Sequence, residues 1–83
     1  MTMKVRVLFF SVLRDITGAA ELEWTCPPAS SLAVLLEELY TRWPKLRAWD
    51  TSLLLAIDCA YVKRNTPLHE GCEVALMPPV QGG

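Results

Sequence analysis

The hydrophobic pattern of the chain begins with two stretches that alternate every second residue, as β-strands do. Residues 4–10 predict a strand whose two faces carry Val5, Val7 and Phe9 on one side and Arg6, Leu8 and Phe10 on the other. Residues 21–26 predict a second strand, which stops at Pro27 because proline lacks the backbone donor that a sheet requires. The turn signal Thr17-Gly18 between the two stretches favours their pairing as a hairpin.

One amphipathic helix is predicted in residues 31–43. Its apolar residues recur at i, i+3, i+4, i+7, i+8 and i+11, which is a single helical stripe: Leu32, Leu35, Leu36, Leu39, Tyr40 and Trp43. Ser30 or Ser31 can cap the free N–H groups at the start of the helix. Pro44 ends the helix because it pushes the preceding residue out of the helical conformation. We interpret the two aromatic members of the stripe as core residues.

Three later stretches complete a predicted sheet. Residues 53–57 form a continuous apolar run, which is typical of a strand covered on both faces, and residues 60–62 can form a short partner strand. In the last strand, residues 73–77, Val74 and Leu76 share one face and Met77 lies on the other. The order ββαβ(β)β with one covering helix predicts an α+β fold. We favour a β-grasp, in which the first and last strands lie side by side at the centre of a mixed sheet.

Composition and charge narrow the classes of function. A chain of 83 residues with 52% hydrophobic residues can form one folded domain, which we place at residues 1–77, with residues 78–83 as a flexible C-terminal tail. The formal net charge of −1 argues against a dedicated nucleic-acid binder. The apolar runs are far shorter than the ~18 residues of a membrane span. We therefore expect a cytoplasmic protein with no nucleic-acid and no membrane partner.

No catalytic or metal-binding motif is recognisable in the sequence. The three cysteines, Cys26, Cys59 and Cys72, form no C-x-x-C pair, so they predict neither a zinc site nor a disulfide framework. We interpret them as small apolar residues that fill the core in a reducing compartment. His69, the only histidine, is followed by Glu70 in a predicted turn, where we expect it to be solvated. A glycine-rich phosphate loop is also missing from the sequence.

The C-terminal segment is the most informative part of the sequence. The last predicted strand is followed at once by Pro78-Pro79 and then by Val80-Gln81-Gly82-Gly83. The prolines cannot extend the sheet, and residues 78–83 can reach roughly 20 Å from it. Glycine has no Cβ and passes through narrow channels, and a terminal carboxylate is ionised at neutral pH. This pattern favours a slender tail whose carboxylate, on Gly83, attacks a nucleotide α-phosphate inside a partner enzyme. A sulfur or amine nucleophile can then displace AMP from the acyl-adenylate.

Taken together, these segments resemble the MoaD family, the small sulfur-carrier subunits of molybdopterin synthase within the ubiquitin-like β-grasp proteins. The resemblance runs from end to end of the chain. Its matching parts are residues 5–10, Arg14-Asp15-x-x-Gly18, Trp43-Pro44, Leu68-x-x-Gly71-x-Glu73-Val74 and residues 78–83. The tail is the specific element among them.

The resemblance implies a carrier that other proteins load and empty. Gly83 is expected to be adenylated with ATP by an E1-like adenylating enzyme and converted to a thiocarboxylate by a sulfurtransferase. The tail then enters the large subunit of the synthase and gives its sulfur to cyclic pyranopterin monophosphate. The family implies a heterotetramer of two small and two large subunits. No cofactor is expected on this chain itself, because ATP is used on the activating enzyme.

Strand parity and the resemblance together predict a docking surface. If the helix covers the face of Val5 and Val74, then Phe10 and Met77 are left outside, and Tyr61 can join them. The family docks with hydrophobic residues at matching positions and with an arginine that matches Arg14. The predicted partner-binding residues are therefore Phe10, Arg14, Tyr61, Met77, Pro78, Pro79, Val80, Gln81 and Gly82.

Four residues at three places in the chain depart from the family pattern, and none of them lies in the tail. Asp58 stands where the family usually has asparagine, and Cys72 replaces an aspartate after Gly71. Leu76-Met77 replaces a more aromatic pair. These departures bear on the local turn chemistry and on which activating enzyme is used.

Two alternatives stay open at this point. One is the related sulfur carrier of thiamine biosynthesis, which shares the Gly-Gly end but usually lacks a Pro-Pro-Val run before it. The other is a ubiquitin-like modifier, whose tail forms an isopeptide bond with lysines of target proteins. The chemistry of the tail begins in the same way in all three classes. An enzyme acting alone is not favoured, because the sequence carries no recognisable catalytic constellation.

Overall fold

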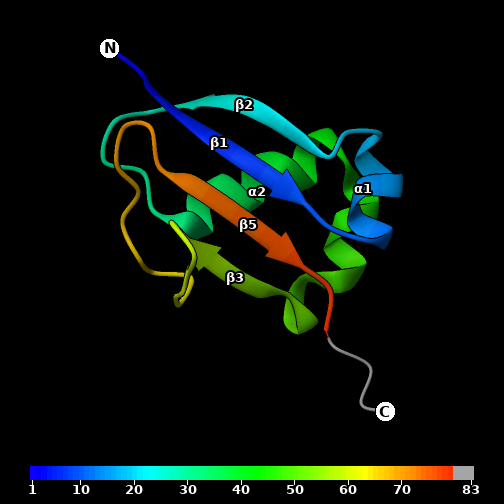
Figure 1. The fold of residues 1–83 in the computed structure, drawn as a ribbon. Coiled ribbons are helices and arrows are strands. Elements are labelled where there is room, and N and C mark those ends of the chain that lie inside the picture. The colour runs from blue at the N-terminus through cyan, green and yellow to red at the C-terminus, as the bar shows by residue number, and fades with distance from the viewer. Residues whose placement is uncertain (80–83) are drawn as a thin grey trace.

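The computed structural model describes residues 1–79, which form a five-stranded mixed sheet with helices packed against one face (Figure 1). The elements are β1 (Met3–Phe9), α1 (Val12–Thr17), β2 (Glu21–Cys26), α2 (Leu32–Arg42), the 3-10 helix η1 (Pro44–Ser52), β3 (Leu54–Ile57), β4 (Ala60–Tyr61) and β5 (Glu73–Met77). The strand order is β2-β1-β5-β3-β4, and β1 and β5 are parallel neighbours. The predicted β-grasp, with its first and last strands side by side, is confirmed.

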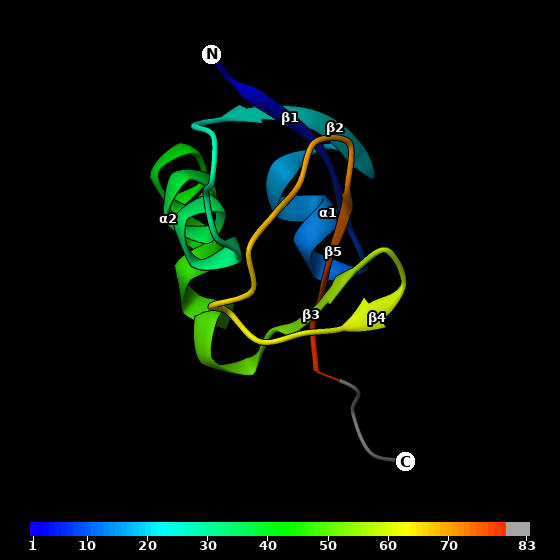
Figure 2. The same ribbon diagram turned by 90° about the vertical axis from the view of Figure 1, so that its left-hand side faces the viewer.

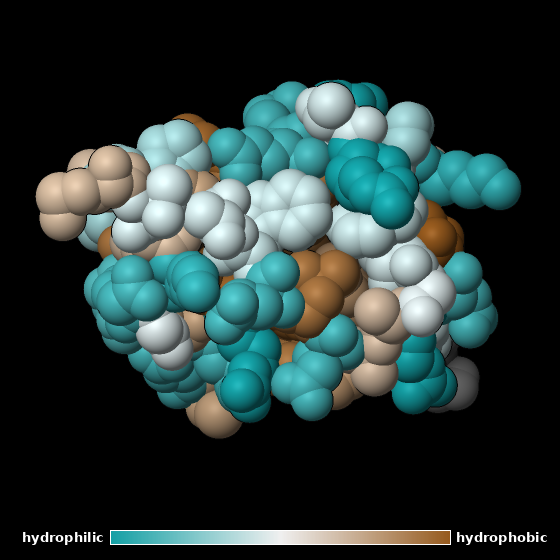
Figure 3. All heavy atoms as spheres, turned by 90° about the horizontal axis from the view of Figure 1, so that it is seen from above, coloured by the Kyte–Doolittle hydropathy of each residue, from teal (hydrophilic) through white to brown (hydrophobic). Residues whose placement is uncertain are grey.

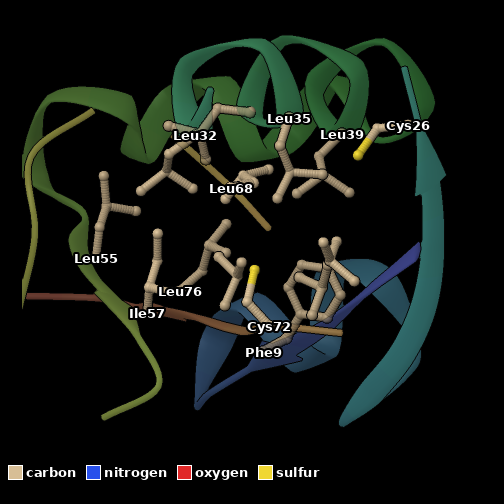
Figure 4. Close-up of a cluster of buried hydrophobic side chains, with 14 of the residues drawn as sticks. Phe9, Cys26, Leu32, Leu35, Leu39, Leu55, Ile57, Leu68, Cys72 and Leu76 are labelled. Carbon is tan, nitrogen blue, oxygen red and sulfur yellow. The ribbon is translucent and has the colours of Figure 1, made fainter. Parts of the chain in front are cut away.

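The hydrophobic core lies between the sheet and α2, which packs behind the sheet in Figure 1 and to its left in Figure 2. Two in-register rows of buried residues cross β1, β5 and β3: Val7, Val74 and Ile57, and then Phe9, Leu76 and Leu55. The predicted helical stripe supplies the opposite wall of the core with Leu32, Leu35, Leu36 and Leu39, all of them buried. Figure 4 labels Leu32, Leu35 and Leu39 on this helix. Each such side chain contributes roughly 1.5–3 kcal/mol by leaving water.

The two ends of α2 follow the predicted signals. At the start, Ser31 is the N-cap residue, and its Oγ accepts the N–H of Val34 at 3.4 Å. At the other end, Trp43 leaves the helical conformation just before Pro44. Trp43 is half-buried and packs edge-on against the ring of Phe9, with 5.9 Å between centroids. The residue that ends the helix, Trp43, therefore also covers part of the hydrophobic core.

Two short helices and one strand environment differ from the sequence-based expectation. The six residues of α1 place Leu13 in the core, but one turn and a half is too short to show a helical period. The nine residues of η1 have a 3-10 period and bury Leu46. The interpretation of residues 53–57 as covered on both faces is wrong, because among residues 1–79 no layer packs on the other side of the sheet, and Leu54 is half-buried. Ala56 is buried on that side because its cross-strand neighbours screen a small side chain.

The cysteines have two different environments, which corrects the expectation that all three fill the core. Cys26 and Cys72 are buried in the core cluster, and burial raises the pKa of the Cys26 thiol. Cys59 is exposed, because it lies at the tip of the β3–β4 hairpin with a φ of 71°. No disulfide links any of the three cysteines.

Candidate docking surface and C-terminal arm

The candidate site lies on the outer face of the sheet, which is the face turned away from α2 and towards the viewer in Figure 1. Side chains that alternate with the core rows point to this face. One in-register row on it crosses four strands: Leu8, Ala75, Ala56 and Tyr61. This arrangement follows from the strand order, because β1, β5 and β3 each have one face in the core.

A shallow hollow of about 250 Å3 gathers the apolar side chains of this face. We call its lining the apolar patch, which consists of Leu8, Phe10, Ala56, Cys59, Tyr61, Ala75 and Met77, with Glu73 at its rim. Phe10 is 44% exposed and Tyr61 is 75% exposed. Large apolar side chains exposed together on one surface are typical of a site that another protein covers.

The other half of the outer face is charged. Lys4 Nζ lies 3.9 Å from Glu23 Oε1, and Arg6 Nε lies 3.5 Å from Glu21 Oε2, so the cations of β1 face the carboxylates of β2. Exposed ion pairs of this kind contribute only about 0–1 kcal/mol to stability. From the side of β2, above Figure 1, the surface is mostly hydrophilic, with a small hydrophobic area between polar side chains (Figure 3). The apolar patch is thus bounded by polar surface on its β2 side.

The C-terminal tail predicted at residues 78–83, here called the C-terminal arm, begins beside the apolar patch. Because β1 and β5 are parallel neighbours, their C-terminal ends lie at the same end of the sheet. There the N–H of Phe10 donates to the carbonyl of Leu76 at 3.3 Å. Met77 pairs with Leu54 and is followed by Pro78 and Pro79, which are half-buried. The chain therefore leaves the sheet at the edge of the patch. The other predicted tail residues, Val80, Gln81, Gly82 and Gly83, lie outside the described residues.

The structure brings together three of the predicted docking residues and separates a fourth. Phe10, Tyr61 and Met77 all line the apolar patch. Arg14 does not line it: this residue is exposed on α1, the helix that follows the end of β1. The helix α1 lies towards the end of the sheet where β5 also ends, as the right-hand side of Figure 1 shows.

Four members of the apolar patch were missed by sequence reasoning. Leu8 and Ala75 carry a usable signal, since each shares strand parity with a predicted member, Phe10 or Met77. Ala56 and Cys59 carry none, because they join the patch only through the pairing of β3 with β5 and β4. The part that was missed is thus the part that depends on strand order.

A turn with unusual geometry stands at the rim of the patch. Asp58 and Cys59 connect β3 to β4 with φ values of 50° and 71°, as in the two-residue hairpin turns that tolerate aspartate and asparagine. The Oδ1 of Asp58 accepts the N–H of Glu73 at 2.9 Å, and its Oδ2 lies 3.0 Å from Nε2 of His69. The bond from Glu73, and then the one from His69, lower the pKa of the Asp58 carboxyl. His69 is exposed, as expected, but it also holds this contact.

Two further findings concern metal-binding clusters and long apolar helices among the described residues. Within residues 1–79, no three side chains of His, Cys, Asp or Glu are grouped so that they could hold a metal ion. In the same part of the chain, no helix combines the length and the apolar character needed to cross a membrane.

Comparison with known proteins gives consistent similarities in sequence and in structure. The sequence profile of the ThiS family matches residues 7–83. A molybdopterin synthase sulfur carrier subunit from Escherichia coli (strain K12) is 36% identical over 81 residues, which cover 95% of this chain and 99% of that protein. A putative molybdopterin converting factor, subunit 1, from Pyrococcus furiosus superposes with a TM-score of 0.86 at 28% identity, covering 94% of this chain and 99% of that one.

A third similarity comes from a protein solved with a partner. It is a chain in the protein-protein complex of subunits 1 and 2 of molybdopterin-converting factor from Helicobacter pylori 26695. The TM-score is 0.68 at 28% identity, and the match covers 98% of this chain and 100% of that one. The fold described above is thus one that has been solved in a complex between two subunits.

Proposed function

Since this chain belongs to the ThiS family, we propose that it is the sulfur-carrier subunit of a molybdopterin synthase and acts in molybdenum cofactor biosynthesis. Its similarity over nearly full length to proteins named as that subunit supports the assignment. The structural observation that carries it is the position of the apolar patch. The patch includes Met77, the last residue of β5, so a protein that covers it would lie beside the start of the C-terminal arm.

The proposed partner on the apolar patch is the large subunit of the synthase. Phe10, Tyr61 and Met77 would be buried in that interface, where apolar contact area supplies most of the binding energy. Arg14 would contribute a charged contact near the arm, and residues 78–82 would lie along the partner. The H. pylori complex of two subunits supports a partner of this kind. We further propose a heterotetramer of two small and two large subunits.

The proposed chemistry takes place at Gly83 in the active sites of partners. On an E1-like adenylating enzyme, the Gly83 carboxylate attacks the α-phosphate of ATP, pyrophosphate leaves and a glycyl adenylate forms. Sulfide-level sulfur (HS⁻), delivered by way of a sulfurtransferase, then attacks the acyl carbon and displaces AMP, so that the C-terminus becomes a thiocarboxylate. In the large subunit, this sulfur forms a bond to cyclic pyranopterin monophosphate, and water then cleaves the acyl–sulfur bond, which leaves the sulfur on the product and returns Gly83 to a carboxylate. The chain itself binds no cofactor in this scheme, because ATP is a substrate held by the activating enzyme.

Intact-mass spectrometry of the protein purified from its own cells tests the proposal. A fraction of the chains is expected to carry sulfur in place of one C-terminal oxygen. An unmodified chain in cells that are making molybdenum cofactor would contradict the assignment. Co-purification separates the alternatives: a large synthase subunit supports our proposal, a thiazole-forming enzyme supports the thiamine pathway, and adducts on lysines support a protein modifier.

Deletion of Gly83 tests the reacting residue. We expect sulfur transfer to be abolished, with a thermal unfolding midpoint close to that of the wild type, because the described core ends at Leu76. The exposed residue Lys45 in η1 provides a control, Lys45→Ala, which should leave both measurements unchanged. If the shortened chain still supported molybdopterin formation, Gly83 would not be the residue that carries sulfur.

A further inference from the structure

The β3–β4 hairpin carries the most exposed aromatic residue of the apolar patch, yet its strand pairing is short. β4 has only two residues, both exposed, and pairs with β3 at two positions, Ala56 with Tyr61 and Ile57 with Ala60. β3 is held by four residue pairs with β5, so the weakly held part of the hairpin is the edge strand β4, which pairs with β3 alone. Contacts at the tip of the hairpin therefore help to fix Tyr61 relative to the rest of the sheet.

Asp58 supplies three such contacts, and all of them reach residues 69–73. Its backbone N–H donates to the carbonyl of Glu73 at 2.8 Å. In return, its Oδ1 accepts the N–H of Glu73 at 2.9 Å, and its Oδ2 lies 3.0 Å from Nε2 of His69. We call these contacts the Asp58 clasp. The clasp joins the tip of the hairpin to the first residue of β5.

The clasp lies on the polar rim of the apolar patch and outside the hydrophobic core. The core rows use Leu55, Ile57, Val74 and Leu76, whose side chains point to the other face of the sheet. Glu73 itself is at the rim of the patch. Loss of the clasp would thus free the hairpin tip relative to β5, while the packing of the core is retained.

We propose that Asp58 is a positioning residue of the docking surface: through its bonds to Glu73 and His69 it fixes the Tyr61 hairpin against β5 and so preorganises the apolar patch for its protein partner. The inference rests on the proposed function, since that partner is the large synthase subunit. Its physical basis is that a preorganised surface loses less binding free energy, because its side chains and loops are already ordered before the partner binds. Asp58 acts through Tyr61 and makes no contact with the reacting carboxylate in this scheme.

Two substitutions at this position separate the clasp from the turn conformation. Asp58→Asn keeps the Oδ1 acceptor and tolerates positive φ, and Asp58→Gly tolerates positive φ but removes both side-chain contacts. Affinity of the full chain for the large subunit is measured by titration calorimetry. We expect Asp58→Gly to weaken binding about five- to tenfold and Asp58→Asn to stay within about twofold of the wild type. The rate of alkylation of the Cys59 thiol, next in the turn, should rise only in the glycine variant.

A double-mutant cycle with Tyr61→Ala tests whether Asp58 acts through that side chain. In the Tyr61→Ala background, Asp58→Gly should cost little further affinity. Equal losses in both backgrounds would overturn the inference, and so would wild-type affinity of Asp58→Gly or a loss that Asp58→Asn does not rescue. Failure of the wild-type chain to bind the large subunit would instead overturn the proposed function.

Discussion

At the scale of single residues, Tyr40 and Asp50 show how a polar group is accommodated beside the core. The Tyr40 ring is buried, and its hydroxyl donates to Oδ1 of Asp50 at 2.5 Å. Nη1 of Arg64 donates to the same oxygen at 2.7 Å, so the carboxylate joins α2, η1 and the segment after β4. Burial, and then the bond to Asp50, raise the pKa of Tyr40 to about 12, and the bond from Tyr40 is the main reason that the pKa of Asp50 is lowered.

The titration of Tyr40 predicts a loss of stability in alkali. Its pKa is higher in the folded chain, at about 12, than its ordinary value of 10.0, so the folded state holds the proton more tightly. The contribution to stability is complete below about pH 10 and is lost as the pH rises towards 12. Denaturant unfolding at several pH values should show a steeper decline above pH 10 in the wild type than in Tyr40→Phe. Parallel curves for the two proteins would contradict the prediction.

The alternation of side chains along a strand correctly predicted which residues lie on the outer face of the sheet, but it cannot predict turns or contacts between strands. Parity assigned Phe10 and Met77 to the outer face because side chains alternate with a fixed period. The exposure of Cys59 could not be predicted in the same way, since a turn has no such period. The clasp at Asp58 was also missed, because its partner Glu73 is brought close only by the pairing of β3 with β5. Whether the patch residues bind a partner stays a prediction.

At the scale of elements, α2 is the helix whose sequence signals all agree. The apolar stripe, the N-cap serine and the terminating proline predict both ends of α2 to within one residue of the observed ends. The ends of the predicted strands also agree with the observed ones to within one residue. The short α1 and the 3-10 helix η1 carry no comparable signal, since one is too brief for a 3.6-residue period and the other has a different period. Tertiary contacts, such as the burial of Leu13 and Leu46, hold them in place.

The buried face of α2 predicts a large difference between two neighbouring positions. Leu35 is completely buried, so Leu35→Ala should lower the free energy of unfolding by about 2–5 kcal/mol through lost burial and the cavity it leaves. The next residue towards the N-terminus, Val34, is 43% exposed and serves as the matched control. Val34→Ala should change stability by less than about 1 kcal/mol. Urea denaturation measures both, and similar losses would show that the helix packs in another orientation.

At the scale of the whole molecule, the sheet separates the hydrophobic core from the proposed docking surface. One face packs on α2, and the other carries the apolar patch beside the end of β5. Substitutions of exposed residues in the apolar patch should therefore change partner affinity with little effect on stability. The sequence predicts these two faces of the sheet, because the alternation of side chains along the strands defines two faces and the predicted amphipathic helix can cover one of them. It could not predict the strand register that places Tyr61 across from Ala56, or the position of Arg14 outside the patch.

Charge placed in the apolar patch tests this separation directly. Phe10→Asp should weaken binding to the large subunit by at least about tenfold, because a carboxylate would be desolvated at the interface. Its thermal unfolding midpoint should stay near that of the wild type, since the side chain is 44% exposed and outside the core cluster. Glu23→Gln, in the charged half of the outer face, is the control and should bind normally. Wild-type affinity of Phe10→Asp would remove the patch from the interface.

The central position of β5 has a consequence for how the molecule is made. β1 is synthesised before the other strands of the sheet, but its parallel neighbour is the strand at residues 73–77, so the middle of the sheet stays open until that last strand is available. Contacts that join such distant segments slow folding, because a long loop has to close first. A chain cut short before β5 would lack the strand that both closes the sheet and leads into the arm.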